Sequence, residues 1–187
     1  MDSISSMDLS EPIEWFAMSA TFGRALKAKV FLESHSVRCF IPMKYEVFSD
    51  GNHGKKRQLV PAISNLLFVN TTRSCIQSLK TGLSYLQYLT RPDGTRRIPI
   101  VVPDCQMEQF ISVCNTCNEK LVYLNPKEIN LEKGTPVQII GGAFDGVEGT
   151  FVKVEGFRNR RVVVSVPGIT AVVVADITNG CIKVLDQ

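Results

Sequence analysis

The side chains that most often bind metals or act as nucleophiles are few and scattered in this sequence. Cys114 and Cys117 form a C-x-x-C pair, whereas a structural zinc site needs about four ligands. The two histidines, His35 and His53, lie far from this pair along the chain. The six cysteines lack the spacing of a stapled secreted domain, so we expect reduced thiols. The sequence therefore predicts no metal site, no cofactor and no redox centre.

Acid–base catalysis also finds little support. No carboxylate pair stands at a recognisable catalytic spacing, and neither histidine lies in a catalytic context. The glycine pair Gly141 and Gly142 lies between two expected strands, whereas a phosphate-binding glycine loop precedes a helix. We therefore expect that the protein is not an enzyme, and an assay for nucleotide hydrolysis tests the alternative.

The composition is that of a globular protein. Hydrophobic residues make up 44% and charged residues 21% of the 187 positions, enough for one or two small cores. No segment reaches the roughly 18 consecutive apolar residues of a membrane helix. The polar, acidic start of the chain indicates a loose tail in a cytoplasmic protein with no membrane partner. The net charge of +3 is too small to identify nucleic acid as the main partner.

The N-terminal part alternates strands with helices, which predicts an α/β layer. Gly23 starts a helix whose Leu26, Val30 and Phe31 form one apolar face. Pro103 and the residue after it open another helix. Strands are expected at residues 13–20, 37–48, 63–69 and 85–89, and a short helix at residues 71–80.

A glycine-containing turn after residue 48 leads into the basic run Lys55, Lys56 and Arg57. This pattern predicts a hairpin with a mobile, positively charged tip. A basic loop is usually just solvated, and contact with nucleic acid is the alternative. The charged run at residues 91–97 predicts a further turn.

The C-terminal part changes to short strands separated by glycine-rich turns. Residues 115–132 are irregular and contain Asn125 and Pro126, so we expect a linker there. After Lys133, strands are expected at residues 136–140, 149–154, 161–166, 169–174 and 182–185. Five strands in about 50 residues without a helix between them are typical of a small closed barrel. Closure also removes the strand edges that promote aggregation.

The segment from Gly134 to Val152 resembles a KOW motif, which consists of a strand, a glycine loop with an aromatic residue, and a glycine entering the next strand. Gly141, Gly142 and Gly146 permit backbone angles that are closed to other residues. The loop therefore turns tightly around Phe144. This ring is either a binding anchor at the loop tip or a cap that folds back on the barrel.

The N-terminal part resembles the N-terminal domain of the NusG family of transcription elongation factors. The resemblance rests on Trp15 to Ala17, Gly23 at the helix start, Ile41 to Met43, and the run Ile63 to Val69. With the KOW motif it covers nearly the whole chain, and it implies an α+β fold of an α/β sandwich and a five-stranded, SH3-like KOW barrel. The implied parts are a tail (1–11), a polymerase-binding domain (12–114), a linker (115–132) and the barrel (133–187).

Three segments resemble specialised, operon-specific members of this family, of the RfaH type or the UpxY-type regulators of capsular polysaccharide operons. These segments are Val37 to Met43, Asn65, and Gly142 to Gly146. The family usually has proline at the Ser64 position and an aromatic residue at the Leu66 position. The polymerase pocket is therefore expected to differ in detail.

The resemblance implies that the N-terminal domain grips the clamp helices of RNA polymerase, bridges the main cleft and suppresses pausing. An apolar groove that receives a helical tip is a recognised source of affinity. Each candidate is alternatively an ordinary core residue, because buried Leu, Phe and Ile are the norm. We expect Phe68→Ala to weaken polymerase binding while leaving the fold intact. The implied polymerase-binding residues, with Phe68 and Phe110 as leading candidates, are Ser19, Leu66, Phe68, Leu89, Met107, Phe110 and Ile111.

The resemblance also implies contacts with the non-template DNA strand of the elongation complex. Charged side chains there would contact phosphate or a flipped base, and a solvated polar face is the alternative. The implied nucleic-acid-binding residues are Arg24, Lys27, Arg73, Ser74 and Lys80.

The KOW barrel of this family recruits a second partner, ribosomal protein S10 or the termination factor Rho. The implied contact loop carries Phe144 and Asp145, and the protein is expected to be a monomer. The valine-rich strands favour a stable β form of this part. A ribosome-associated or RNA-binding KOW protein is the alternative function, which would explain the barrel but not the N-terminal part.

Overall fold

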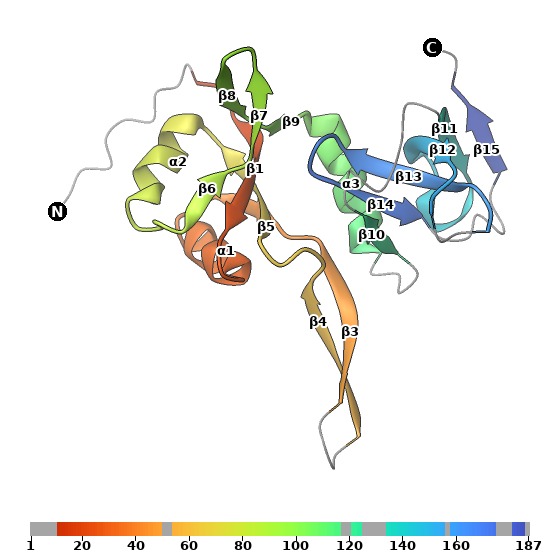
Figure 1. The fold of residues 1–187 in the computed structure, drawn as a ribbon, viewed down its shortest axis with the longest axis horizontal. Coiled ribbons are helices and arrows are strands. Elements are labelled where there is room, and N and C mark those ends of the chain that lie inside the picture. The colour runs from red at the N-terminus through yellow and green to blue at the C-terminus, as the bar shows by residue number, and fades with distance from the viewer. Residues whose placement is uncertain are drawn as a thin grey trace. The chain divides into compact units, whose positions relative to one another are not determined.

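The computed structural model describes residues 11–49, 54–116, 121–124, 134–155, 158–174 and 181–185. Strands predominate, and three α-helices occur among the described residues, so the fold is of the expected mixed type (Figure 1). The chain divides into two compact units, residues 1–42 with 63–104 and residues 43–62 with 105–187. The domain boundaries and the closed barrel that the sequence indicates stay predictions. No helix in the described ranges is long and apolar enough to span a membrane.

The sheet of the first unit is built around β1 (Glu14–Ala20). Its antiparallel neighbours are β5 (Leu66–Thr71), β6 (Leu86–Tyr88) and β9 (Val101–Val102). On the outer side of β5, the short strand β2 (Arg38–Phe40) completes the order β2-β5-β1-β6. Since β1 and β5 are buried along most of their lengths, both faces of these central strands are covered, which explains their nearly continuous apolar sequences.

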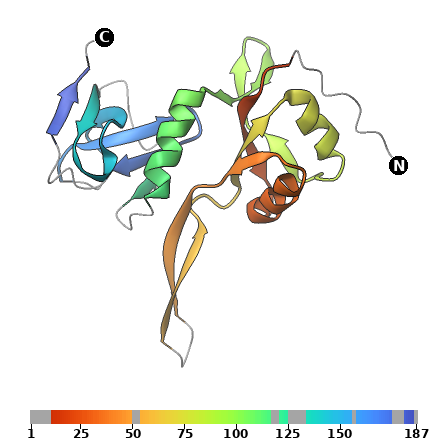
Figure 2. The same cartoon turned by 180° about the vertical axis from the view of Figure 1, so that it is seen from behind.

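Helices α1 (Ala25–Ser34) and α2 (Arg73–Lys80) lie on the same side of this sheet (Figure 1, Figure 2). The predicted apolar face of α1 is wrong. Leu26 and Val30 are 46% and 69% exposed, and the buried residues are instead Ala25, Ala28 and Leu32. Small alanine side chains let a helix backbone approach a sheet closely, so the helix is turned about its axis from the predicted orientation.

The strand expected at residues 37–48 is two strands. β2 ends at Phe40 and pairs with β5, whereas β3 (Met43–Ser49) pairs with β4 (Lys55–Pro61). The break lies at Pro42. Proline has no N–H group to donate to a neighbouring strand, and it restricts the backbone conformation of the residue before it. The predicted hairpin is confirmed by the pairing of β3 with β4, while its tip at residues 50–53 lies outside the described residues.

A second hairpin joins β7 (Thr90–Asp93) and β8 (Arg96–Pro99), where the sequence predicted only a charged turn. Its turn contains Gly94 at φ 58°, a left-handed conformation that favours glycine. The guanidinium group of Arg97 donates to the Oγ1 and carbonyl oxygen of Thr90, at 2.8 and 3.0 Å. Arg97 therefore links β8 to β7 and stabilises the hairpin.

The second unit contains α3 (Asp104–Asn115), which begins after Pro103 as predicted, and a six-stranded sheet of order β10-β14-β13-β12-β11-β15. The five predicted strands are confirmed, and β10 forms within the segment that we expected to be an irregular linker. A short 3-10 helix, η4 (Gly142–Phe144), lies between β11 and β12. The strands are β10 (Val122–Leu124), β11 (Thr135–Ile140), β12 (Glu148–Val152), β13 (Arg161–Val166), β14 (Thr170–Val174) and β15 (Cys181–Val184).

Candidate functional site

The strand register gathers four of the predicted polymerase-binding residues on one face of the first sheet. Ser19 pairs with Leu66, and Ala17 pairs with Phe68. The N–H of Leu89 donates to the Ala17 carbonyl oxygen at 2.9 Å, which places Leu89 beside that pair. Because alternate residues of a strand point to the same face, Ser19, Leu66, Phe68 and Leu89 share one face.

These four side chains differ in exposure. Phe68 is completely buried and Leu66 is 4% exposed, whereas Ser19 and Leu89 are half-buried. Because truncating a fully buried phenylalanine in a central strand leaves a cavity, we expect Phe68→Ala to destabilise the fold, and the effect on polymerase binding stays a prediction. Ser19 and Leu89 are the members of this group with surface available for contact.

The remaining polymerase-binding candidates lie on α3. Phe110 and Ile111 follow Met107 by three and four residues, so both lie beside it on one stripe of the helix. Met107 and Phe110 are completely buried, and Ile111 is half-buried. As α3 belongs to the second unit, the assembly of this stripe with the sheet face into one site stays a prediction.

The nucleic-acid-binding candidates lie on the two helices of the first unit or directly before α1. Arg24 precedes α1 and stacks its guanidinium over the rings of Phe22 and Tyr85, 5.4 and 4.9 Å from the centroids. The ammonium group of Lys80 lies 5.1 Å from the Tyr88 ring centroid. Such cation–π contacts orient a cation without neutralising it. The exposed side chains among the candidates are Arg24, Lys27, Arg73 and Ser74.

The N-terminus of α2 binds the carboxylate of Glu11, a residue of the segment that was expected to be a loose tail. The Ser74 N–H donates to Oε2 of Glu11 at 3.0 Å, and Thr72 Oγ1 accepts from the Cys75 N–H at 3.2 Å. Hydrogen bonds from the Ser74 hydroxyl and backbone lower the pKa of Glu11. The partial positive charge of a helix N-terminus favours an anion there, and in this structure that anion is the carboxylate of Glu11.

The glycine loop of the second unit has the predicted conformation. Gly141, Gly142 and Gly146 have φ angles of 84°, 77° and 79°. The exposed carboxylate of Asp145 accepts a hydrogen bond from the Gly141 N–H and so ties the loop to itself. Phe144 in η4 is half-buried. Its exposure is therefore intermediate between that of a free anchor and that of a buried cap, the two expected alternatives.

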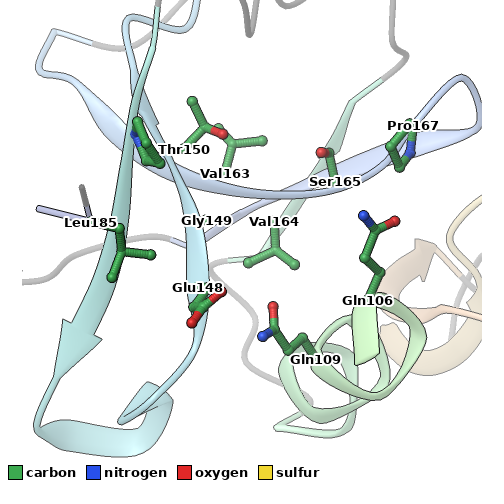
Figure 3. A pocket seen from close by; sticks show the side chains of 11 residues that line it. Gln106, Gln109, Glu148, Gly149, Thr150, Val163, Val164, Ser165, Pro167 and Leu185 are labelled. Carbon is green, nitrogen blue, oxygen red and sulfur yellow. The ribbon is translucent and has the colours of Figure 1, made fainter. Parts of the chain in front are cut away.

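A pocket of about 220 Å³ lies in the second unit, where Gln106 and Gln109 of α3 face β13 (Figure 3). Its one ionisable lining residue is Glu148, and Oε1 of Gln106 is buried without a partner among the described residues. The described part of the chain contains no cluster of three or more potential metal ligands. Cys114 is buried on α3, and Cys117 lies outside the described residues. Among the described residues, Glu148 is thus the only lining group of this pocket that could donate or accept a proton as an acid or base.

Comparison with known proteins identifies the family. The model of the family described as "Transcription termination factor nusG" matches residues 13–111. A solved structure entitled "Domain interaction in Thermotoga maritima NusG" shares 18% identity, covering 87% of this chain and 93% of that chain with a TM-score of 0.41. Comparison with curated proteins gives no match. Since the family match spans more than half of the 187 residues, this chain belongs to the NusG family of transcription factors.

Proposed function

We propose that this protein is a non-catalytic elongation and antitermination factor that binds the clamp helices of RNA polymerase. The observation that carries the proposal is the coincidence of the family match with one sheet face that gathers Ser19, Leu66, Phe68 and Leu89. An apolar face on paired strands suits a helical tip, because rigid strands hold the contacting side chains in place. Binding of the clamp would favour processive transcription.

The residues of this face differ in burial, and we assign them different roles accordingly. Phe68 and Leu66 pack within the fold and hold the strands, whereas Leu89 and Ser19 retain exposed surface. Ile111 on α3 is the matching half-buried candidate of the second unit. Affinity for the polymerase is accordingly assigned to Leu89, Ser19 and Ile111, while the buried residues act by positioning them.

The non-template DNA strand is assigned to the opposite face of the first sheet. Tyr88 pairs with Met18, and its ring meets that of Phe16 edge-on at 5.5 Å, so Tyr88 points away from the Phe68 face. Lys80 of α2 stacks on this same Tyr88 ring. The candidates on α1 and α2 would thus contact DNA while the other face contacts protein, which avoids competition between the two partners.

We assign the second unit's glycine loop, with Phe144 and Asp145, to a KOW-type contact with ribosomal protein S10 or Rho. The tight loop that Gly141, Gly142 and Gly146 permit supports this assignment. An operon-specific role of the RfaH or UpxY type, such as at capsular polysaccharide operons, rests on the resemblance of Val37 to Met43 and of the Asn65 position.

The test is binding of the full chain to cognate core RNA polymerase without nucleic acid. We expect Leu89→Lys to raise the Kd about tenfold or more, because a charge is placed in an apolar contact. Val30→Lys is the matched control, as Val30 is 69% exposed on α1, and its Kd should equal that of the wild type. A second variant, Ile111→Lys, repeats the test on α3.

Circular dichroism and denaturation must show that each variant is folded. The proposal is contradicted if the folded wild-type chain does not bind polymerase. It is also contradicted if Leu89→Lys and Ile111→Lys both bind as tightly as Val30→Lys. Co-sedimentation with ribosomes in place of polymerase would instead favour the ribosome-associated alternative.

A further inference from the structure

The β3–β4 ribbon, residues 43–49 with 55–61, presents side chains to solvent on both of its faces. Its two strands form a sheet by themselves, as Figure 1 and Figure 2 show. Tyr45, Val47, Phe48 and Leu59 are 40% to 62% exposed. A two-stranded ribbon is marginally stable in water, and large exposed apolar side chains usually mark a contact surface.

Each face of this ribbon combines an aromatic ring with a cation. On the Tyr45 face, Arg57 places its guanidinium carbon 3.8 Å from the centroid of the Tyr45 ring. On the Phe48 face, Phe48 pairs directly with Lys56 across the strands. Successive residues of β4 point to opposite faces, so the run from Lys55 to Arg57 distributes positive charge to both sides.

The described residues of the ribbon carry an excess of positive charge. Its described residues include four cations, Lys44, Lys55, Lys56 and Arg57, and one carboxylate, Glu46. Lys44 neutralises this carboxylate through an ion pair of 2.6 Å within β3. The exposed Lys55 and Lys56 of β4 lie opposite Ser49 and Phe48, so no carboxylate of the described residues of β3 stands directly across from them.

We propose that the β3–β4 ribbon is a DNA-binding arm that enters the major groove of a duplex. The major groove of B-form DNA admits a two-stranded ribbon, and phosphates line both of its walls. A ribbon in this groove meets base edges with one face, and the long side chains of Lys55 and Lys56 can reach the phosphates of the walls. Tyr45, Val47 and Leu59 share one face of the ribbon and provide apolar contact with base edges.

The base of the ribbon is anchored, as an arm requires. The Tyr123 hydroxyl of β10 donates to the Met43 carbonyl oxygen at 3.2 Å, within the same unit. This site is separate from the α1 and α2 residues assigned to the non-template strand. The inference therefore goes beyond the proposed function, and its test needs no polymerase.

The test is fluorescence anisotropy of a labelled DNA duplex with the full chain over a series of salt concentrations. We expect Lys55→Ala with Lys56→Ala to weaken binding about tenfold and to reduce the salt slope by about two, because two phosphate contacts are lost. The matched control is Arg91→Ala with Arg96→Ala, which removes the same charge from exposed positions of the β7–β8 hairpin. This control should bind within about twofold of the wild type.

Several outcomes overturn the proposal: no binding of the duplex, an unchanged affinity of the ribbon variant, or an equal loss in the control. An RNA duplex of the same sequence bound as tightly as DNA also overturns it, since the deep, narrow A-form groove excludes a ribbon. Amide spectra of the labelled chain give a second readout. Added DNA duplex should shift the signals of β3 and β4 and leave those of β7 and β8 in place, and the reverse pattern contradicts the proposal.

Discussion

The two large sheets of this protein fill their interiors with different side chains. In the first sheet, Phe16, Met18, Leu67 and Phe68 are completely buried in the paired strands β1 and β5. In the second sheet, β13 and β14 are instead valine-rich and β14 is buried throughout, with Val152, Val154, Val163, Ala171 and Val173 forming one cluster. Large side chains fill the interior of the first sheet, whereas small side chains in closely spaced strands fill that of the second.

This difference predicts opposite sensitivities. Removing atoms from a core of large side chains leaves a cavity that the surroundings close only in part. Adding atoms where strands already meet closely forces the backbone apart. The first sheet should therefore be destabilised most by truncation of its side chains, and the second by their enlargement.

The largest expected effect is that of Phe68→Ala in the first unit. Because Phe68 is completely buried, we expect the free energy of unfolding to fall by about 3–5 kcal/mol. Phe22→Ala is the control, since Phe22 is 84% exposed, and its effect should stay within about 0.5 kcal/mol. Chemical denaturation measures both. Similar small losses for the two variants would refute the assignment of Phe68 to the core.

An intermediate effect is expected from Gly149→Ala in the second unit. A Cβ atom at this position would lie 2.8 Å from Cγ1 of Val162 and from the Val163 carbonyl oxygen, on the adjacent strand. We expect a loss of about 1–3 kcal/mol in the free energy of unfolding. Hydrogen exchange should locate faster amide exchange in β12 and β13. If the variant is as stable as the wild type, the strands do not approach as closely as described.

The smallest effect concerns the tether between Glu11 and α2, which is the hydrogen bond from the Ser74 N–H to the Glu11 carboxylate. The hydrogen bonds from Ser74 lower the pKa of Glu11 in the folded protein below its unfolded value. The tether is therefore fully present above the unfolded pKa, and it is lost as the pH falls through the folded pKa. The Ser74 amide signal should titrate in this acidic range in the wild type and stay constant in Glu11→Gln. Identical titrations in both proteins would disprove the tether.

The local sequence predicted most strands, because valine-rich runs between glycines leave few alternatives. It predicted the wrong face of α1, since two apolar stripes are present and only packing against the sheet selects Ala25, Ala28 and Leu32. It also missed β10, whose three residues form a strand only because β14 supplies a paired edge. Short elements that depend on a distant partner carry little signal of their own.

The face of the sheet that three of the candidate residues share follows from the sequence pattern, whereas the exposure of their side chains does not. Alternation along the strands places Ser19, Leu66 and Phe68 on one face once the pairing of β1 with β5 is known. Exposure depends on which other elements cover that face, so Phe68 looked like a contact residue and is part of the core. The carboxylate of Glu11 at α2 was missed because residues 11 and 74 are joined by tertiary structure alone.

The most direct test of the central claim, that this member of the NusG family acts on elongating polymerase, is single-round transcription by the cognate enzyme through a pause site and a terminator. We expect the wild-type chain to shorten the pause and increase read-through. Leu89→Lys should lose both effects, and Val30→Lys should keep them. Unchanged pausing and termination at a concentration of wild-type protein that saturates the polymerase would contradict the account.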